Sequence, residues 1–123
     1  MMNLKKRIDS FGFAFKGIVT LLQTQPNAQI HIVAIFIVSI LGFLLKISTT
    51  DWCFVIFAFS MVLAAEAFNT AIEFIVDLVS PQYHPLAGKA KDVAAAAVLL
   101  TAVGAALVGM IVFVPKLWHF IQK

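Results

Sequence analysis

Four polar side chains interrupt a long apolar stretch near the middle of the chain: Glu66, Asn69, Glu73 and Asp77. Their spacing of i, i+3, i+7 and i+11 places them on one face of a helix. An ionised side chain at the centre of a bilayer costs about 2.5–3.5 kcal/mol on insertion scales. We therefore expect this polar face to contact protein, a cation or a bound substrate rather than lipid.

The residue types on this face suit phosphoryl transfer. That reaction needs a base or a group that positions the attacking hydroxyl, a divalent cation, and positive charge for the phosphates. Glu66 is the predicted base, Glu73 the predicted ligand of Mg²⁺, and Asn69 lies between them and can orient either. Lys91 could neutralise phosphate. The last helix is predicted to begin at residues 90–92, where free amide groups would bind an anion.

Composition places the chain in a membrane. It has 123 residues, of which 62% are hydrophobic, and its mean hydropathy is +1.00, whereas soluble domains are roughly 45–50% apolar. One domain, residues 1–123, is predicted. The single Cys53 excludes an internal disulfide and a four-cysteine metal site. The net charge of +3 is too small for a dedicated nucleic-acid binder and suits contact with anionic lipid headgroups.

We predict an all-α integral membrane fold with an N-terminal amphipathic surface helix and three transmembrane helices. The surface helix carries basic residues on one side and Phe, Leu and Ile on the other. Pro26, a short polar turn at 47–51 and a proline-containing loop at 80–89 separate the helices. The predicted ranges are 3–25 for the surface helix and 28–46, 52–79 and 91–114 for the spans.

The distribution of basic residues predicts the orientation. Three spans put the N-terminus and the loop at 80–92 on one side, which carries six Lys and Arg residues against three on the other. The N-terminus is therefore predicted to be cytosolic. The polar face would then rise from mid-membrane at Glu66 to the cytosolic surface at Asp77, a distance of about 16 Å at ~1.5 Å per residue.

The longest pattern in the chain joins the polar face to the start of the last helix. It reads Glu66-x-x-Asn69-Thr70-Ala71-Ile72-Glu73-x-x-Val76-Asp77, then Tyr83-His84-x-Leu86-x-Gly88-Lys89-Ala90-Lys91-Asp92 and Ala96-Ala97-Val98-Leu99. Weaker matches are Gly12-Phe13-Ala14-Phe15-Lys16-Gly17 and Asn27 with Ile30-His31. With these motifs the chain resembles the small bacterial membrane kinases that phosphorylate diacylglycerol or undecaprenol, over about residues 8–114.

This resemblance implies ATP-dependent phosphorylation of a membrane lipid alcohol at the cytosolic face of the bacterial inner membrane. It also implies a homotrimer with active sites shared between subunits, and ATP and Mg²⁺ as cofactors. Glu66 would be the catalytic base, Asn69 would position it, and Glu73 would bind the metal. The residues expected at the nucleotide are Lys6, Phe13, Gly17, Asp77, His84, Lys91 and Asp92.

Two positions depart from the family pattern. The family usually has a metal-binding glutamate where this chain has Gln25, and commonly an arginine where it has Gln29. Gln25 would be an uncharged ligand. Asp9, His31 or a lipid phosphate stay open as substitutes, although a histidine on an apolar helix is more typical of a helix contact. A catalytically weakened or inactive kinase is therefore one alternative.

A non-enzymatic oligomer with an acidic face along an ion path is the other alternative. A path across the membrane needs polar groups toward both surfaces. No charged residue lies between Asp51 and Glu66, and the last span offers only Thr101. The sequence therefore favours a site that opens to the cytosol and ends near mid-membrane.

Overall fold

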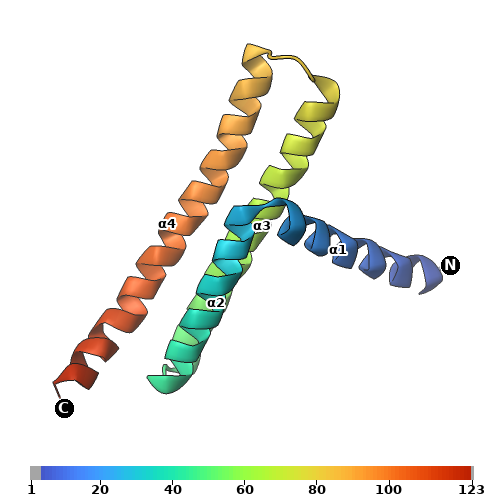
Figure 1. Cartoon of the computed structure of the whole chain (residues 1–123). Coiled ribbons are helices and arrows are strands. Elements are labelled where there is room, and N and C mark those ends of the chain that lie inside the picture. The colour runs from blue at the N-terminus through green and yellow to red at the C-terminus, as the bar shows by residue number, and fades with distance from the viewer. Residues whose placement is uncertain (1–3, 123) are drawn as a thin grey trace.

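The structure is a computed structural model that describes residues 4–122, and within that range every regular element is a helix. The helices are α1 (Leu4–Thr24), α2 (Pro26–Leu44), α3 (Thr49–Val79) and α4 (Pro85–Ile121). Figure 1 shows α2, α3 and α4 running in roughly the same line, while α1 joins α2 near the middle of α3 and extends away on the side opposite α4. The last three are long and apolar enough to cross a membrane, and α1 is less apolar. The predicted all-α fold with three spans is confirmed.

The ends of α2 differ from the predicted 28–46. Only Gln25 separates α1 from α2, which begins at Pro26, because proline suits the first turn of a helix, where its missing N–H is not needed. The helix ends at Leu44 rather than at 46. Lys46 has a φ of 49°, a left-handed conformation that terminates helices.

The helix α3 begins three residues before the predicted 52, because its first turn is capped. The side chain of Ser48 accepts a hydrogen bond from the Asp51 N–H, and the Asp51 carboxylate accepts one from the Ser48 N–H. Asp51 also pairs with Lys116 of α4 at 3.3 Å. With 31 residues, α3 is about 46 Å long at ~1.5 Å per residue, against a hydrocarbon core of about 30 Å. One end therefore extends beyond the membrane.

The helix α4 is longer at both ends than the predicted 91–114. It begins at Pro85, where the Nδ1 atom of His84 accepts a hydrogen bond from the Leu86 N–H at 3.2 Å, and it continues through Pro115 to Ile121. Residues 90–92 lie inside this helix, where their amide groups belong to the helical ladder. The predicted anion site at the amides of 90–92 is therefore wrong.

The buried apolar core lies where the turn between α2 and α3 meets the second half of α4. It contains Ile47, Val55, Val112 and Phe113. Trp52 packs against this cluster and contacts Phe43 with ring centroids 4.9 Å apart. Along the rest of the spans most large apolar side chains are exposed, so they meet lipid or other protein.

Candidate active site

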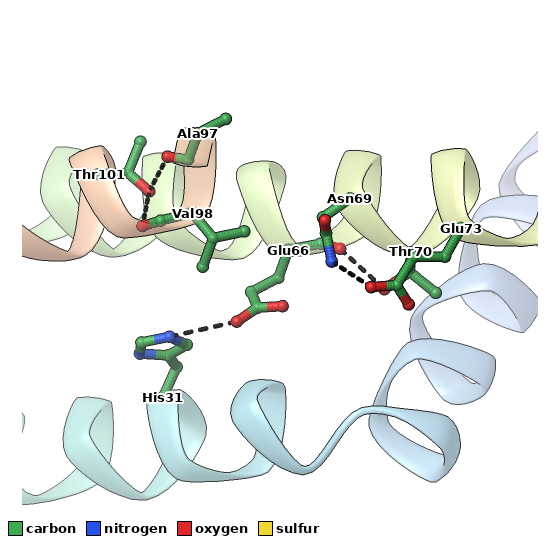
Figure 2. A network of polar contacts seen from close by, with 8 residues as sticks. All are labelled: His31, Glu66, Asn69, Thr70, Glu73, Ala97, Val98 and Thr101. Atoms are coloured by element: carbon green, nitrogen blue, oxygen red, sulfur yellow. Dashed lines mark hydrogen bonds and ion pairs between the residues drawn. The ribbon is translucent and has the colours of Figure 1, made fainter. Parts of the chain in front are cut away.

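Glu66 forms the buried end of the polar face and is only 1% exposed. It lies where α3 faces α2, and its Oε1 atom is 3.3 Å from Nε2 of His31 (Figure 2). Among the described residues Oε1 makes no hydrogen bond. A buried carboxylate is costly unless it is paired or hydrogen-bonded. The structure thus holds a carboxylate that is shielded by protein and has unused accepting capacity.

Two turns further along α3, Glu73 receives amide donors at both carboxylate oxygens. Asn69 Nδ2 donates to Oε1 at 3.0 Å, and Gln25 Nε2 donates to Oε2 at 3.3 Å. The Oδ1 atom of Asn69 is buried and has no hydrogen-bond partner among residues 4–122. In this structure the amide of Asn69 therefore supports Glu73, one of the two glutamates that its spacing allows it to orient, whereas the family resemblance assigns it to Glu66.

The oxygen atoms at Glu73 and Asn69 are of the type that could hold a magnesium ion. Mg²⁺ is usually held by one or two carboxylates together with phosphate oxygens and water, and Glu73 and the unpartnered Oδ1 of Asn69 are such hard ligands. No cluster of three or more His, Cys, Asp or Glu that could hold a metal occurs in the described part of the chain. Gln25, the other predicted metal ligand, lies beside Glu73 and donates to it.

The exposed end of the polar face joins α3 to α4 through an ion pair between Asp77 and Lys91. Both residues line a pocket of about 210 Å³ under the loop at 80–84, together with Tyr83 and His84. Asp92 is exposed and is not part of that lining. Of the predicted nucleotide residues, three therefore come together within one chain.

The nucleotide residues predicted on α1 do not join them. Lys6 and Phe13 are exposed, Phe13 at 69%, and Figure 1 shows the N-terminal half of α1 extending away from α3 and α4. Gly17 instead lines an apolar pocket of about 380 Å³ between α1 and α3, beside Thr70 and Phe74. One chain thus assembles only part of the predicted nucleotide site.

The sequence analysis did not predict the contact of His31 with Glu66. His31 is 35 positions from Glu66 in the chain, and the sequence favoured a plain helix contact for it. One signal was available, because His31 is the sole ionisable residue in the range 26–44. An ionisable group in a span usually faces the protein interior and a functional partner.

Comparison with known proteins identifies the family of the chain. Residues 12–113 match the family model described as prokaryotic diacylglycerol kinase. The undecaprenol kinase of Bacillus subtilis (strain 168) is 40% identical over 93% of both chains. The diacylglycerol kinase of Escherichia coli (strain K12) is 30% identical over 92% of this chain and 90% of its own. That of Synechocystis is 38% identical over 88% of this chain and 62% of its own. The chain therefore belongs to the prokaryotic diacylglycerol kinase family, a family of lipid kinases.

Proposed function

We propose that this chain transfers the γ-phosphate of ATP to the hydroxyl of a membrane lipid alcohol. The observation that carries the proposal is the polar face of α3, which joins a buried carboxylate at Glu66 to the Asp77–Lys91 pair near the exposed loop. A lipid hydroxyl could reach the first from the bilayer, and a nucleotide could reach the second from water. No other face of the described helices offers this sequence of groups.

In the proposed step Glu66 accepts the proton of the lipid hydroxyl. The hydroxyl oxygen forms a bond to the γ-phosphorus, the bond from that phosphorus to the β–γ bridging oxygen breaks, and ADP leaves with the electron pair. The proton on Glu66 then passes to water. Glu73 would hold magnesium, which would supply positive charge to offset the negative charge that develops on the phosphates.

The acceptor is diacylglycerol or undecaprenol, both of which present a terminal hydroxyl near the headgroups. We favour an undecaprenol-type acceptor, because the relative that is 40% identical is named undecaprenol kinase. The residues that would touch the lipid chain are generic apolar ones, so the choice between the two rests on this similarity.

The nucleotide site is proposed to form between copies of the chain in a homotrimer. Asp77, His84, Lys91 and Asp92 would come from one subunit, and Lys6, Phe13 and Gly17 from the α1 helix of a neighbour. Two observations support this. The first half of α1 leads away from its own α3 and α4 (Figure 1), and most large apolar side chains on the spans are exposed in the single chain.

We place the polar face at the cytosolic surface of the bacterial inner membrane, where ATP is available. The six basic residues on the side of α1 and the loop between α3 and α4 support this orientation. The long α3 then carries Asp77 beyond the hydrocarbon while Glu66 stays within it.

A weakened or inactive kinase is the second candidate, and the specific observation behind it is Gln25. Its amide donates to Glu73 and contributes no negative charge. Metal affinity would then depend on a single carboxylate and on the phosphates.

The decisive experiment is phosphate transfer from γ-labelled ATP by purified protein in mixed micelles with Mg²⁺. Diacylglycerol and undecaprenol are offered separately, and Glu66→Gln is the matched control. Label in one lipid that depends on Glu66 supports the kinase and names the acceptor. A folded, trimeric protein that labels no lipid would favour the inactive alternative.

A further inference from the structure

The polar groups that neighbour Glu66 on its own helix are already engaged. The hydroxyl of Thr70 donates to the backbone carbonyl of Glu66 at 2.8 Å, and the amide nitrogen of Asn69 donates to Glu73. Neither of these bonds reaches the Glu66 carboxylate. Its orientation must therefore depend on a group from another helix.

His31 of α2 is that group. Its Nε2 atom lies 3.3 Å from Glu66 Oε1, and the two side chains are 25% and 1% exposed. Figure 2 shows the imidazole and the carboxylate pointing toward each other across the gap between α2 and α3. The histidine also borders an apolar pocket of about 200 Å³ whose walls come from α2, α3 and α4. It therefore lies at the border between apolar surroundings and the polar face.

We propose that His31 is a positioning residue that holds the Glu66 carboxylate for proton abstraction, an inference that rests on the proposed kinase function. In this role the Nε2–H group of His31 donates to Oε1 and leaves Oε2 to accept the proton of the lipid hydroxyl. This is the general relation of a catalytic base to a third group that orients it.

The geometry fits a pair that completes its hydrogen bond only when substrates bind. A separation of 3.3 Å is slightly longer than the usual 2.7–3.2 Å for N–H···O bonds. Catalytic hydrogen bonds are often long without substrate and shorten in the productive complex. A misplacement of about 1 Å in a reacting group can lower the rate roughly 100-fold.

The test compares three variants on α2: His31→Leu, His31→Gln and, as the matched control, Ser39→Ala. We expect His31→Leu to lower kcat about 100-fold with the KM for ATP unchanged, since Asp77 lies three turns further along α3 and Lys91 lies on α4. His31→Gln keeps an N–H donor, so its kcat should be at least tenfold higher than that of His31→Leu. Ser39→Ala should match the parent. Rates are normalised to folded protein, so a merely structural role would leave kcat unchanged.

A second readout does not need activity. The ¹⁵N resonance of His31 Nε2, recorded in selectively labelled protein, should shift in Glu66→Gln and stay in place in Glu73→Gln. The positioning role is wrong if the parent is active and His31→Leu has the parental kcat. It is also wrong if the His31 resonance does not shift in Glu66→Gln. In both cases the proposed kinase function stands. A parent that labels no lipid alcohol would overturn the proposed function itself, together with this role.

Discussion

The two ends of the helical bundle are built differently. At the turn between α2 and α3, apolar side chains pack closely, the capping groups of Ser48 and Asp51 satisfy each other, and Asp51 also meets Lys116. On the polar face, buried oxygens of Glu66 and Asn69 have no hydrogen-bond partner among the described residues. Buried polar groups normally have a hydrogen-bond partner, which a side-chain adjustment, water, a ligand or another subunit can supply. One end is closed by packing and capping, and the other leaves buried polar groups unpaired.

The sharpest way to examine this contrast is Glu66→Gln, which removes the proposed base and keeps its shape. We expect kcat to fall roughly 100- to 10,000-fold, the usual range for a lost general base, while thermal unfolding in detergent changes little. Both are measured on the same preparation with labelled ATP and the preferred lipid. Parental turnover in this variant would remove Glu66 from the mechanism.

Gly42→Ala should lower stability and leave turnover unchanged, the opposite of Glu66→Gln, because Gly42 lies at the closely packed end of the bundle. A Cβ at Gly42 would lie 2.8 Å from two atoms of the Trp52 ring, which is also held by Phe43. We expect a loss of about 1–3 kcal/mol in stability, typical of overpacking, with normal turnover in the folded fraction. Thermal unfolding in detergent measures it.

Gly104→Ala is the control for this overpacking, since an added Cβ there meets nothing within 4 Å in the chain. It should unfold at the parental temperature or slightly above. Equal losses in both variants would mean that glycine itself, rather than the Trp52 contact, is responsible.

Lys91→Met tests the exposed end of the polar face. Methionine keeps the apolar stem and removes the ammonium group that pairs with Asp77. We expect the KM for ATP to rise about tenfold, corresponding to ~1.4 kcal/mol, with a smaller change in kcat. Steady-state kinetics at varied ATP measure this, and Lys89→Met on the same helix serves as the control of equal charge. Similar effects from both substitutions would mean that the positive charge acts over a distance and that the pair with Asp77 has no specific role.

Gln25→Glu should have the smallest effect. It places a second carboxylate beside Glu73, where the amide now donates, and so adds a charged ligand for magnesium. Activity should equal the parent's at high Mg²⁺ and be a few-fold higher, or equal, at low Mg²⁺. A magnesium titration of the rate measures this. A large loss would show that residue 25 is not at a metal position.

The sequence was sufficient to predict the fold and the placement of the four polar residues on one face of a single helix. The composition and the spacing of the apolar stretches predicted three spans and a less apolar first helix, and the structure confirms them. The 3- to 4-residue spacing from Glu66 to Asp77 follows directly from helical geometry. The helix ends were less well predicted. Pro26 and the prolines of the loop at 80–89 were taken to separate helices, although Pro26 and Pro85 begin helices, and α4 continues past the predicted end at 114 through Pro115.

The periodicity of the sequence could not predict which residues of different helices contact each other. The bond of Gln25 to Glu73 and the contact of His31 with Glu66 join residues far apart in the chain, and each depends on how α2 packs against α3. Only the family resemblance drew attention to residue 25. The catalytic, metal and nucleotide roles stay predictions that the experiments above address.

The capped turn at Ser48 has one more consequence, which concerns bilayer thickness. In the proposed orientation this end of α3 lies at the membrane surface opposite the polar face, and Glu66 lies about 22 Å along the helix from Asp51 at ~1.5 Å per residue. In a hydrocarbon core of about 30 Å, that leaves the carboxylate roughly 8 Å below the other surface. Acyl chains a few carbons shorter or longer would bring it nearer to the headgroups or bury it further, so turnover should depend on the lipid in which the protein is reconstituted.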